Sequence, residues 1–488
     1  MHSIVEAIAT YAAKQPEKLC VADGKNTFTY LQYWEHIAGF ARQLAECGVK
    51  PGDCVVVRNS QNAAFLTAGL ALQLLGAVFV PIEKNVADRR IREICEEVEA
   101  VWYIATKEPD FAISYLDMGN VLTHAMPVSM EHVVFPKGTD LAEILFTTGT
   151  TGKSKGIEIL HKNVIAVAEN VIDGVEMKPD NVELIPVPLS HSHGLRRYYA
   201  NMLNGSSVVL ADGVIFVKQI FERMRTYGVT SMDLVPAALA ALLKLGGDEL
   251  GQFAGQIDYI QLGSAPIPEA DRERLRLLFP DSRLYNFYGT TESGCSCIFD
   301  FNKYGDKKNC IGRPTCHAVF AFLDEDGKEV SATKNQPGFL ACKGEMNMAG
   351  YYRSPSQNEA VFSGDFIVTQ DMAYIGDDGM IYLLGRKGDV IQSGGNKISP
   401  QEVEEAALEM EGIADCACIP VESPLLGQEP KLFYVAAKGI SLQEEELYEF
   451  LKRKLETYKV PKKIERIDQI PRTYNGKIQR NLLMERER

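Results

Sequence analysis

The sequence is short of the features that mark secreted and metal-binding proteins. Its eleven cysteines include no CxxC pair, so neither a zinc ribbon nor a disulfide framework is indicated. Two CxC pairs, Cys295/Cys297 and Cys416/Cys418, place both thiols on one face of a strand, where cysteine behaves as a small apolar residue. We therefore expect reduced, structural cysteines and no metal site built on them.

Long apolar runs and positive charge are also lacking. The longest apolar helix candidate, residues 63–75, is shorter than the ~20 residues that span a bilayer. Residues 1–6 carry an acid where a signal peptide needs basic and then apolar residues, so we expect a cytoplasmic protein without stable membrane insertion. With 65 acidic and 51 basic residues the net charge is -14, which argues against a nucleic-acid partner.

The chain does have a regular alternation of strand-like and helix-like segments. At 488 residues, 46% of them apolar, it is long enough for about three domain equivalents. β-Branched runs such as residues 54–58 and 182–186 alternate with helical patterns such as residues 87–98 and 215–227. This alternation predicts parallel sheets with helices on both faces. The predicted fold class is α/β, with two stacked βα subdomains.

The later part of the chain differs in character. Residues 310–382 show short alternating strands separated by Gly, Pro and Asp turns, which predicts a small β-barrel attached to the α/β body. The residues from Asp389 onward indicate a compact α+β unit. We predict a large N-terminal domain of residues 1–388 and a small C-terminal domain of residues 389–488.

The clearest functional signal is the turn at residues 146–156, Phe-Thr-Thr-Gly-Thr-Thr-Gly-Lys-Ser-Lys-Gly. Glycines let backbone N–H groups converge on an anion, while hydroxyl and ammonium groups add donors and positive charge. The common phosphate loop G-x-x-x-x-G-K-[ST] is excluded by spacing, because Thr147 stands where its first glycine is required. The composition of the turn still indicates a cradle for a polyphosphate.

This turn resembles the T-[ST]-G-T-T-G-x-P-K-G signature of the adenylate-forming, or AMP-binding, superfamily. The superfamily includes acyl- and aryl-CoA synthetases, peptide-synthetase adenylation domains and luciferases; here Ser154 replaces the usual proline. Further superfamily segments follow in order as far as residue 480, so the resemblance covers nearly the whole chain. In this turn it implies the ATP-binding residues Thr147, Thr148, Gly149, Thr150, Thr151, Gly152 and Lys155.

Segments in the middle of the chain resemble those that bind the acid and the nucleotide. The segment P-L-S-H-S-H-G resembles P-[LM]-[FY]-H-x-x-G, which implies that its first histidine, His191, lies beside the acyl carboxylate. The segment N-F-Y-G-T-T-E resembles N-x-Y-G-x-T-E and implies an adenine-stacking face on Tyr288, a phosphate-binding hydroxyl on Thr291 and a Mg²⁺ ligand in Glu292. The nucleotide-binding residues implied by this segment and by G-S-A-P upstream are Gly263, Ser264, Ala265, Asn286, Phe287, Tyr288, Gly289 and Thr290.

Two more nucleotide-binding residues are implied further along. The segment T-Q-D resembles T-G-D, which implies that Asp371 accepts the ribose hydroxyls; Gln370 adds a side chain where relatives have glycine. The segment G-M-I-Y-L-L-G-R-K-G-D resembles G-[YF]-x-x-x-x-G-R-x-x-D and implies that Arg386 holds the ribose or phosphate.

The end of the chain resembles the small, mobile domain of the superfamily. Asp389 stands at the implied hinge between the two domains. Gly394 and Gly395 stand where the backbone approaches the pantetheine arm of the incoming thiol. Lys477, in P-R-T-Y-N-G-K-I-Q-R, stands at the position of the catalytic lysine, where it bridges the carboxylate and the α-phosphate.

The resemblance implies an enzyme, an AMP-forming acyl- or aryl-CoA ligase that uses ATP, Mg²⁺ and coenzyme A. It forms an acyl-adenylate and pyrophosphate, then transfers the acyl group to the CoA thiol. The nearest alternative is a stand-alone ligase that loads an acyl-carrier protein. A luciferase-like oxygenase and a non-catalytic nucleotide-binding protein are further alternatives, the latter disfavoured by the joint presence of Lys477, Glu292 and Arg386.

The acid itself is left open. No aspartate follows the histidine segment closely, which disfavours an α-amino acid. The guanidinium groups of Arg196 and Arg197 can grip a second carboxylate, although a solvated or sheet-bracing role is the commoner one. Aryl, dicarboxylic and short- or medium-chain fatty acids are all compatible, as is any oligomeric state. Candidates for an apolar acyl pocket, which are equally candidates for the core, are Tyr198, Tyr199, Met232, Val235 and Phe287.

Overall fold

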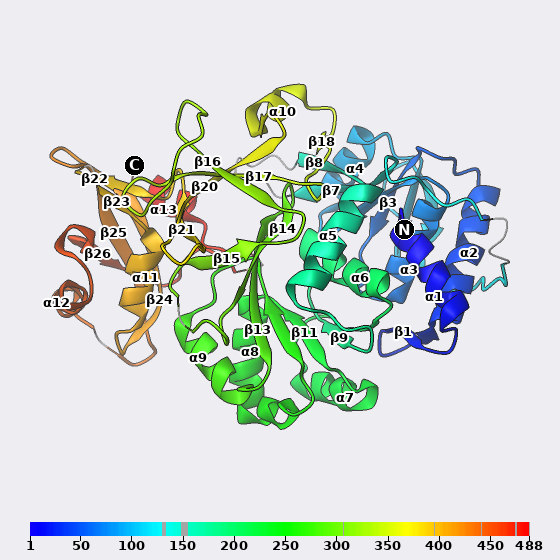
Figure 1. The fold of residues 1–488 in the computed structure, drawn as a ribbon, viewed down its shortest axis with the longest axis horizontal. Helices are drawn as coiled ribbons and strands as arrows, with labels where there is room; N and C mark the ends of the chain where they lie inside the picture. The colour runs from blue at the N-terminus through cyan, green and yellow to red at the C-terminus, as the bar shows by residue number, and fades with distance from the viewer. Residues whose placement is uncertain are drawn as a thin grey trace.

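The computed structural model describes residues 1–128, 133–147, 155–305, 307–394, 396–440, 442–473 and 476–487, with Thr147 described by its backbone alone. Two sheets form the body of the molecule, and another sheet forms a C-terminal lobe. In Figure 1 this lobe, orange to red, lies at one end of the molecule, and the N-terminal helices, in blue, lie at the other.

The first sheet has the strand order β18-β8-β7-β4-β3-β5-β6. Its central strands are parallel, and β8 runs antiparallel to β7. The central strand Cys54–Arg58 is almost wholly buried, which explains its continuous β-branched run. The bounds are β3 (Cys54–Arg58), β4 (Val78–Ile82), β5 (Trp102–Ala105), β6 (Ser114–Asp117), β7 (Leu141–Thr147), β8 (Lys155–Leu160) and β18 (Gly350–Tyr351).

The second sheet has a parallel centre in the order β13-β12-β11-β9-β10-β1, with β2 at one edge. The N-terminal strand β1 pairs with β10, so the chain begins in the second sheet before it builds the first. The bounds are β1 (Leu19–Ala22), β2 (Thr27–Thr29), β9 (Val182–Ile185), β10 (Ser207–Leu210), β11 (Ser231–Leu234), β12 (Tyr259–Leu262) and β13 (Arg283–Thr290).

Helices fill the space between the two sheets and cover their outer faces. The largest core packs α1, α2, α3, α5 and α6 between residues of both sheets, such as Phe79 on β4 and Ile185 on β9. Helix α3 is apolar on nearly all sides because it lies inside this layer. Helix α4 covers the first sheet, and α7, α8 and α9 cover the second. The bounds are α1 (Ile4–Lys14), α2 (Tyr30–Glu46), α3 (Ala63–Leu74), α4 (Asp88–Glu97), α5 (His161–Gly174), α6 (Ser192–Asn204), α7 (Val217–Tyr227), α8 (Pro236–Gly246) and α9 (Glu269–Leu278).

The β-rich segment expected as a small barrel continues the second sheet. Strand β14 is antiparallel to β13, and it pairs in turn with β15, which pairs with β21. The path then runs through β20 and β17 to β16, and the segment has a small core of its own. The bounds are β14 (Gly294–Asp300), β15 (Cys310–Pro314), β16 (Val319–Leu323), β17 (Gly338–Lys343), α10 (Pro355–Val361), β19 (Phe362–Ser363), β20 (Phe366–Ile375) and β21 (Ile381–Arg386).

The C-terminal lobe is an antiparallel sheet with an added parallel strand, covered by helices. Its order is β23-β22-β25-β24, with β26 alongside β25. Cys416 and Cys418 share one buried face of β24, as their spacing predicts. The bounds are β22 (Ile391–Ser393), β23 (Asn396–Ile398), α11 (Pro400–Leu408), β24 (Ile413–Ser423), β25 (Gly427–Ala436), α12 (Glu444–Lys454), β26 (Lys463–Arg466) and α13 (Arg480–Arg486).

The lobe meets the body through apolar and charged contacts. Val390, between β21 and β22, is buried in a cluster with Phe339 and Met372 of the body. The Nζ atom of Lys308 lies 3.5 Å from Oε1 of Glu409, which caps α11 in the lobe. None of the helices over the described residues combines the length and apolar character needed to cross a bilayer.

Candidate active site

One edge of the site is the hairpin of β7 and β8. Thr147 pairs with Lys155 at the point where the predicted phosphate cradle begins and ends. The ammonium of Lys155 lies 4.7 Å from the ring centroid of Tyr351, within the range of a cation–π contact. Of the residues predicted to bind ATP, Thr148, Gly149, Thr150, Thr151 and Gly152 lie outside the described residues.

Tyr351 connects this hairpin to the predicted metal ligand. It lies on β18, which pairs with β8, and its hydroxyl donates a 2.9 Å hydrogen bond to Oε1 of Glu292. Burial, and then the charge of Glu292, raise the pKa of Tyr351 above its usual range. The phenol therefore stays a neutral donor to the carboxylate. A single side chain thus contacts both Lys155 and Glu292.

A second cluster joins the predicted ribose and adenine residues. The hydroxyl of Tyr288 donates a 2.6 Å hydrogen bond to Oδ2 of Asp371, and Oδ1 of Asp371 lies 3.4 Å from Nε of Arg386. Asp371 and Arg386 face each other across β20 and β21. Gln370, the residue that departs from the superfamily pattern, is exposed, and its carbonyl accepts from the backbone N–H of Lys387. Tyr288, Asp371 and Arg386 thus form one contact group.

The turn between β13 and β14 holds the rest of the N-F-Y-G-T-T-E segment. A Cβ atom on Gly289 would lie 1.8 Å from the carbonyl oxygen of Gly294, so only glycine fits there. Thr290 bonds to Ser293 through both its backbone N–H and its hydroxyl, which closes the turn. Oδ1 of Asn286 is buried and accepts no hydrogen bond from the described residues. It is therefore a buried polar atom without a hydrogen-bond donor among the described residues.

His191 is the N-cap residue of α6. Its Nε2 atom lies 3.8 Å from Oε2 of Glu83, which follows strand β4. The side chain is half-buried, and its contact with Glu83 places it at the boundary between the two sheets.

His193, which the sequence reasoning passed over, makes the more elaborate contacts. Its Nδ1 atom lies 2.8 Å from Oγ of Ser264, and its Nε2 atom donates to Oδ1 of the buried Asp233 over 2.8 Å. A Cβ atom on Gly263 would lie 3.2 Å from Cε1 of His193, so the ring packs on the Gly263 backbone. The signal that could have found it is a second histidine two residues after the first, in the first turn of the same helix.

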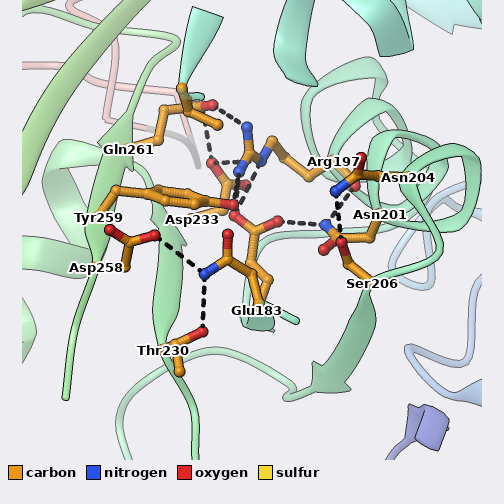
Figure 2. A network of polar contacts seen from close by, with 12 residues as sticks. Glu183, Arg197, Asn201, Asn204, Ser206, Thr230, Asp233, Asp258, Tyr259 and Gln261 are labelled. Atoms are coloured by element: carbon orange, nitrogen blue, oxygen red, sulfur yellow. Dashed lines mark hydrogen bonds and ion pairs between the residues drawn. The ribbon is translucent and has the colours of Figure 1, made fainter. Parts of the chain in front are cut away.

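Arg196 and Arg197 are neither solvated nor free to hold a substrate carboxylate. Both are fully buried, and each reaches a different sheet: Arg196 donates to Glu143 of β7 over 2.5 Å, and Arg197 donates to Glu183 of β9. Arg197 also donates to Gln261 of β12, as Figure 2 shows. The expectation of a solvated pair is wrong, and the bracing role holds. Their partners lie far away in sequence, which hid them.

The candidates for an apolar acyl pocket belong largely to the core. Tyr198 and Tyr199 are buried between the sheets, where their hydroxyls bond to Tyr33 and Glu143. Met232 is fully buried under the outer helices of the second sheet. Phe287 is buried and Val235 half-buried in the core between the sheets.

The loop of Lys477 reaches the body from the C-terminal lobe. Its backbone is held by bonds to Thr473, and a Cβ atom on Gly476 would lie 3.6 Å from Cβ of Ala237 on α8. The Lys477 side chain is exposed, yet desolvation by the atoms around it, and then the charge of Arg386, lower its pKa; Asp371 and Glu292 raise it in part. The lysine therefore shares one electrostatic environment with three residues of the body.

The predicted hinge and thiol residues lie at the start of the lobe. Asp389 lies 3.7 Å from Nη1 of Arg480, and burial raises the pKa of its carboxyl while the Arg480 charge opposes the change. The N–H of Gly394 donates to the carbonyl of Leu426 at the tip of the β24–β25 hairpin. Gly394 adopts a φ of 56°, which favours glycine. Gly395 lies outside the described residues.

Two family models match most of the chain. The model of the AMP-binding enzyme family matches residues 8–352, and that of the AMP-binding enzyme C-terminal domain matches residues 402–477. The chain therefore belongs to the AMP-binding enzyme family.

Individual relatives match over almost their whole length. A 2-succinylbenzoate–CoA ligase of Geobacillus kaustophilus is 29% identical over 96% of this chain and 95% of the relative. A ligase of Rhodococcus jostii, named 3-[(3aS,4S,7aS)-7a-methyl-1,5-dioxo-octahydro-1H-inden-4-yl]propanoyl:CoA ligase, is 24% identical over 99% of this chain and 98% of the relative. The structure of O-succinylbenzoate coenzyme A synthetase from Bacillus subtilis, in complex with ATP and magnesium ion, matches at 25% identity with a TM-score of 0.86, over 98% of this chain and 99% of that one.

Proposed function

We propose that the protein is an ATP-dependent, AMP-forming carboxylic acid–CoA ligase. The observation that carries this proposal is that the predicted nucleotide and metal residues come together in two contact groups, Lys155–Tyr351–Glu292 and Tyr288–Asp371–Arg386. Lys477 of the C-terminal lobe lies in the electrostatic environment of Arg386, Asp371 and Glu292 of the body. An anionic carboxylate can attack an anionic phosphate only where such charges are neutralised and aligned.

We assign the nucleotide to the cluster around Tyr288. Tyr288 supplies a flat face for the adenine beside Asn286, and Asp371 retains lone pairs for the ribose hydroxyls beside Arg386. The phosphates then extend toward Lys155 and the turn before it. Thr291 supplies a hydroxyl for the α-phosphate. Gly263, Ser264 and Ala265 are assigned to the adjoining pocket wall.

The carboxylate of Glu292 fits a hard cation, because one of its oxygens accepts from Tyr351 and the other takes no hydrogen bond from the described residues. Mg²⁺ held there supplies charge neutralisation at the phosphates. Lys477 aligns the acid with the α-phosphate, and His191 borders the acid. The product of this step is an acyl-adenylate with release of pyrophosphate.

The second step needs the other side of the lobe. We place the domain boundary at 388/389 and the pivot at Asp389, so that a rotation withdraws Lys477 and presents Gly394 and Gly395 to the thiol. The glycine backbone leaves room for a pantetheine arm. The CoA thiol then displaces AMP from the acyl group.

CoA is the acceptor we propose, rather than a carrier protein, since the relatives are named CoA ligases. We also propose a cytoplasmic location, where ATP and CoA are present together. The experiment is pyrophosphate release across a panel of aryl, keto-aryl, dicarboxylic and short- and medium-chain acids, including 2-succinylbenzoate, with and without CoA. An acid-dependent signal that yields acyl-CoA supports the proposal; a signal that requires a holo carrier protein, or no acid dependence at all, refutes it.

A further inference from the structure

Adjacent arginines on α6 each reach a different sheet. Arg197 donates to Glu183 of β9 and to Gln261 of β12, both in the second sheet, as Figure 2 shows. Arg196 donates instead to Oε1 of Glu143 on β7, a strand of the first sheet, over 2.5 Å. Helix α6 is therefore fixed to both sheets by two consecutive residues.

The contact with the first sheet is a small polar group inside the largest apolar core. Glu143 and Arg196 are buried, and Oε2 of Glu143 accepts a 2.9 Å hydrogen bond from the hydroxyl of Tyr199. That hydroxyl accepts in turn from Nε2 of Gln73 on α3 over 3.2 Å. Tyr199 and Leu145, which shares a strand face with Glu143, both belong to the apolar core. Because water is excluded there, the loss of either ionic partner leaves the other charge uncompensated.

The two guanidinium groups differ in how completely their donors are used. Every nitrogen of the Arg197 guanidinium has an acceptor, since Nε and Nη2 contact Glu183, Nη2 also contacts Tyr259, and Nη1 contacts Gln261. Nε and Nη2 of Arg196 have no acceptor among the described residues, so its contact with the first sheet is the single bond from Nη1. One donor at that place is therefore enough to keep this contact.

The two ends of the Glu143–Arg196 contact lead to the two groups that react. Along β7, Glu143 precedes Thr147, which pairs with Lys155, one of the residues assigned to the phosphates. Arg196 lies in the second turn of α6, the helix whose N-cap is His191, the residue assigned to the acid. The contact therefore joins the strand of the phosphate hairpin to the helix that borders the acid.

We propose that Arg196 and Glu143 are positioning residues that set the separation between this hairpin and this helix, and so bring the carboxylate of the acid in line with the α-phosphate. The inference rests on the proposed function, because it needs the adenylation step. Attack at phosphorus depends steeply on geometry, and a displacement of about 1 Å can lower the rate ~100-fold. Thiolysis of the adenylate does not need this alignment, because pyrophosphate has already left.

The test follows both half-reactions of the whole enzyme with the acid that the wild type turns over best. In Arg196→Met the maximal rate of acid-dependent ATP–pyrophosphate exchange should fall about tenfold to 100-fold, because the hydrogen bond to Glu143 is lost. The KM values for ATP and for the acid should each change less than about threefold, and thiolysis of a preformed acyl-adenylate less than about twofold. A merely structural role would lower both rates together.

Arg196→Lys tests whether the single hydrogen bond is what matters. An ammonium can donate to Glu143, and the nitrogens that the substitution removes have no acceptor among the described residues. The exchange rate of Arg196→Lys should therefore stay within about threefold of the wild-type rate, although the same change at a guanidinium with several acceptors is not conservative.

The double variant Arg196→Met/Glu143→Met separates alignment from stability. It leaves no uncompensated charge in the core, and apolar replacement of a buried ion pair is often neutral or stabilising, so it should fold even if Arg196→Met does not. Its exchange should be as slow as that of Arg196→Met, because the hydrogen bond is still missing. Asp258→Asn is the control: Asp258 pairs with Arg283 within the second sheet, so this variant should leave both half-reactions unchanged.

Four outcomes would overturn the inference: unchanged exchange in Arg196→Met, equal losses in exchange and thiolysis, wild-type exchange in the double variant, or exchange in Arg196→Lys as slow as in Arg196→Met. A wild type that turns over no acid would instead refute the proposed function, and this inference with it.

Discussion

The hydroxyl of Tyr351 donates a 2.9 Å hydrogen bond to Oε1 of Glu292, and the face of the same ring lies 4.7 Å from the ammonium of Lys155. Tyr351 thereby joins the strand that leaves the phosphate cradle to the carboxylate proposed to hold Mg²⁺. Its ring can act on Lys155 and its hydroxyl on Glu292 independently, which makes the two contacts separable by mutation.

Tyr351→Phe should weaken Mg²⁺-dependent ATP binding without disturbing Lys155. The substitution keeps the ring but removes the hydrogen bond to Glu292, so the carboxylate loses one of its fixed points. We expect the Mg²⁺ concentration for half-maximal ATP binding to rise about tenfold, by the free energy of a charge-assisted hydrogen bond. Isothermal titration with ATP across a Mg²⁺ series measures this. Tyr352→Phe is the control, and equal behaviour of the two variants would contradict the assignment.

Lys477→Ala should separate the two half-reactions. The ammonium is needed to align the acid and the α-phosphate, so acid-dependent ATP–pyrophosphate exchange should fall by about 100-fold or more. Thiolysis of a preformed acyl-adenylate by CoA should be nearly unchanged, because the proposed rotation withdraws Lys477 before that step. Both rates are measured on the same preparation. Equal losses in the two rates would contradict the proposed rotation of the C-terminal lobe between the two steps.

The pH dependence should report the environment of Lys477. Desolvation and the charge of Arg386 lower the pKa of Lys477. Its ammonium therefore loses a proton at a lower pH than an ordinary lysine, whose pKa is about 10.4. Adenylation, measured as kcat/KM for ATP, should therefore decline on the alkaline side before free lysine titrates. In Lys477→Arg the decline should move to higher pH, since a guanidinium stays charged. An alkaline limb at the same pH in both enzymes would show that another group causes it.

Lys308→Glu should disfavour the arrangement in which Lys477 faces the body. Lys308 lies between Glu269 of the body and Glu409 of the lobe, at 3.6 and 3.5 Å. Reversal of its charge places three carboxylates together. Because exposed pairs contribute at most about 1 kcal/mol, pyrophosphate exchange should slow only about threefold to fivefold, and less at high salt.

Thiolysis of preformed adenylate should not slow in Lys308→Glu. A compensating Lys308→Glu/Glu409→Lys variant should restore exchange, since it exchanges the signs across the same contact. A loss of exchange that salt does not reduce, or that the double variant does not restore, would argue against an effect on lobe arrangement.

Much of the fold could be predicted from local patterns. The run at Cys54–Arg58 is predicted at its observed bounds, and the run at residues 182–186 is a strand that ends one residue earlier, at Ile185, because each is a short buried run between clear breaks. The family assignment depended on contiguous segments and is confirmed by the family models. Each of these features depends on residues that are close together in the sequence, so it can be predicted from the sequence alone.

Contacts between distant segments were harder to predict. For Arg196 and Arg197 the sequence left open a solvated, a sheet-bracing and a substrate-binding role, and only the folded chain shows that Glu143 and Glu183 pair with them. Likewise, nothing in the sequence shows that Asp233 lies next to His193. The continuation of the second sheet into β15 and β21 depends on pairing between remote strands. Long-range pairing therefore marks the limit of what the sequence alone could give.

The burial of Val390 bears on how the enzyme rests between turnovers. A rotation at Asp389 that moves Val390 away from Phe339 and Met372 would expose its isopropyl group to water. This exposure costs about 1.5–3 kcal/mol. Such a difference weights the two orientations by roughly tenfold or more. If the lobe turns at Asp389 as proposed, the burial of Val390 would favour the present orientation in the idle enzyme, and binding of the adenylate and the thiol would have to supply the free energy for the turn.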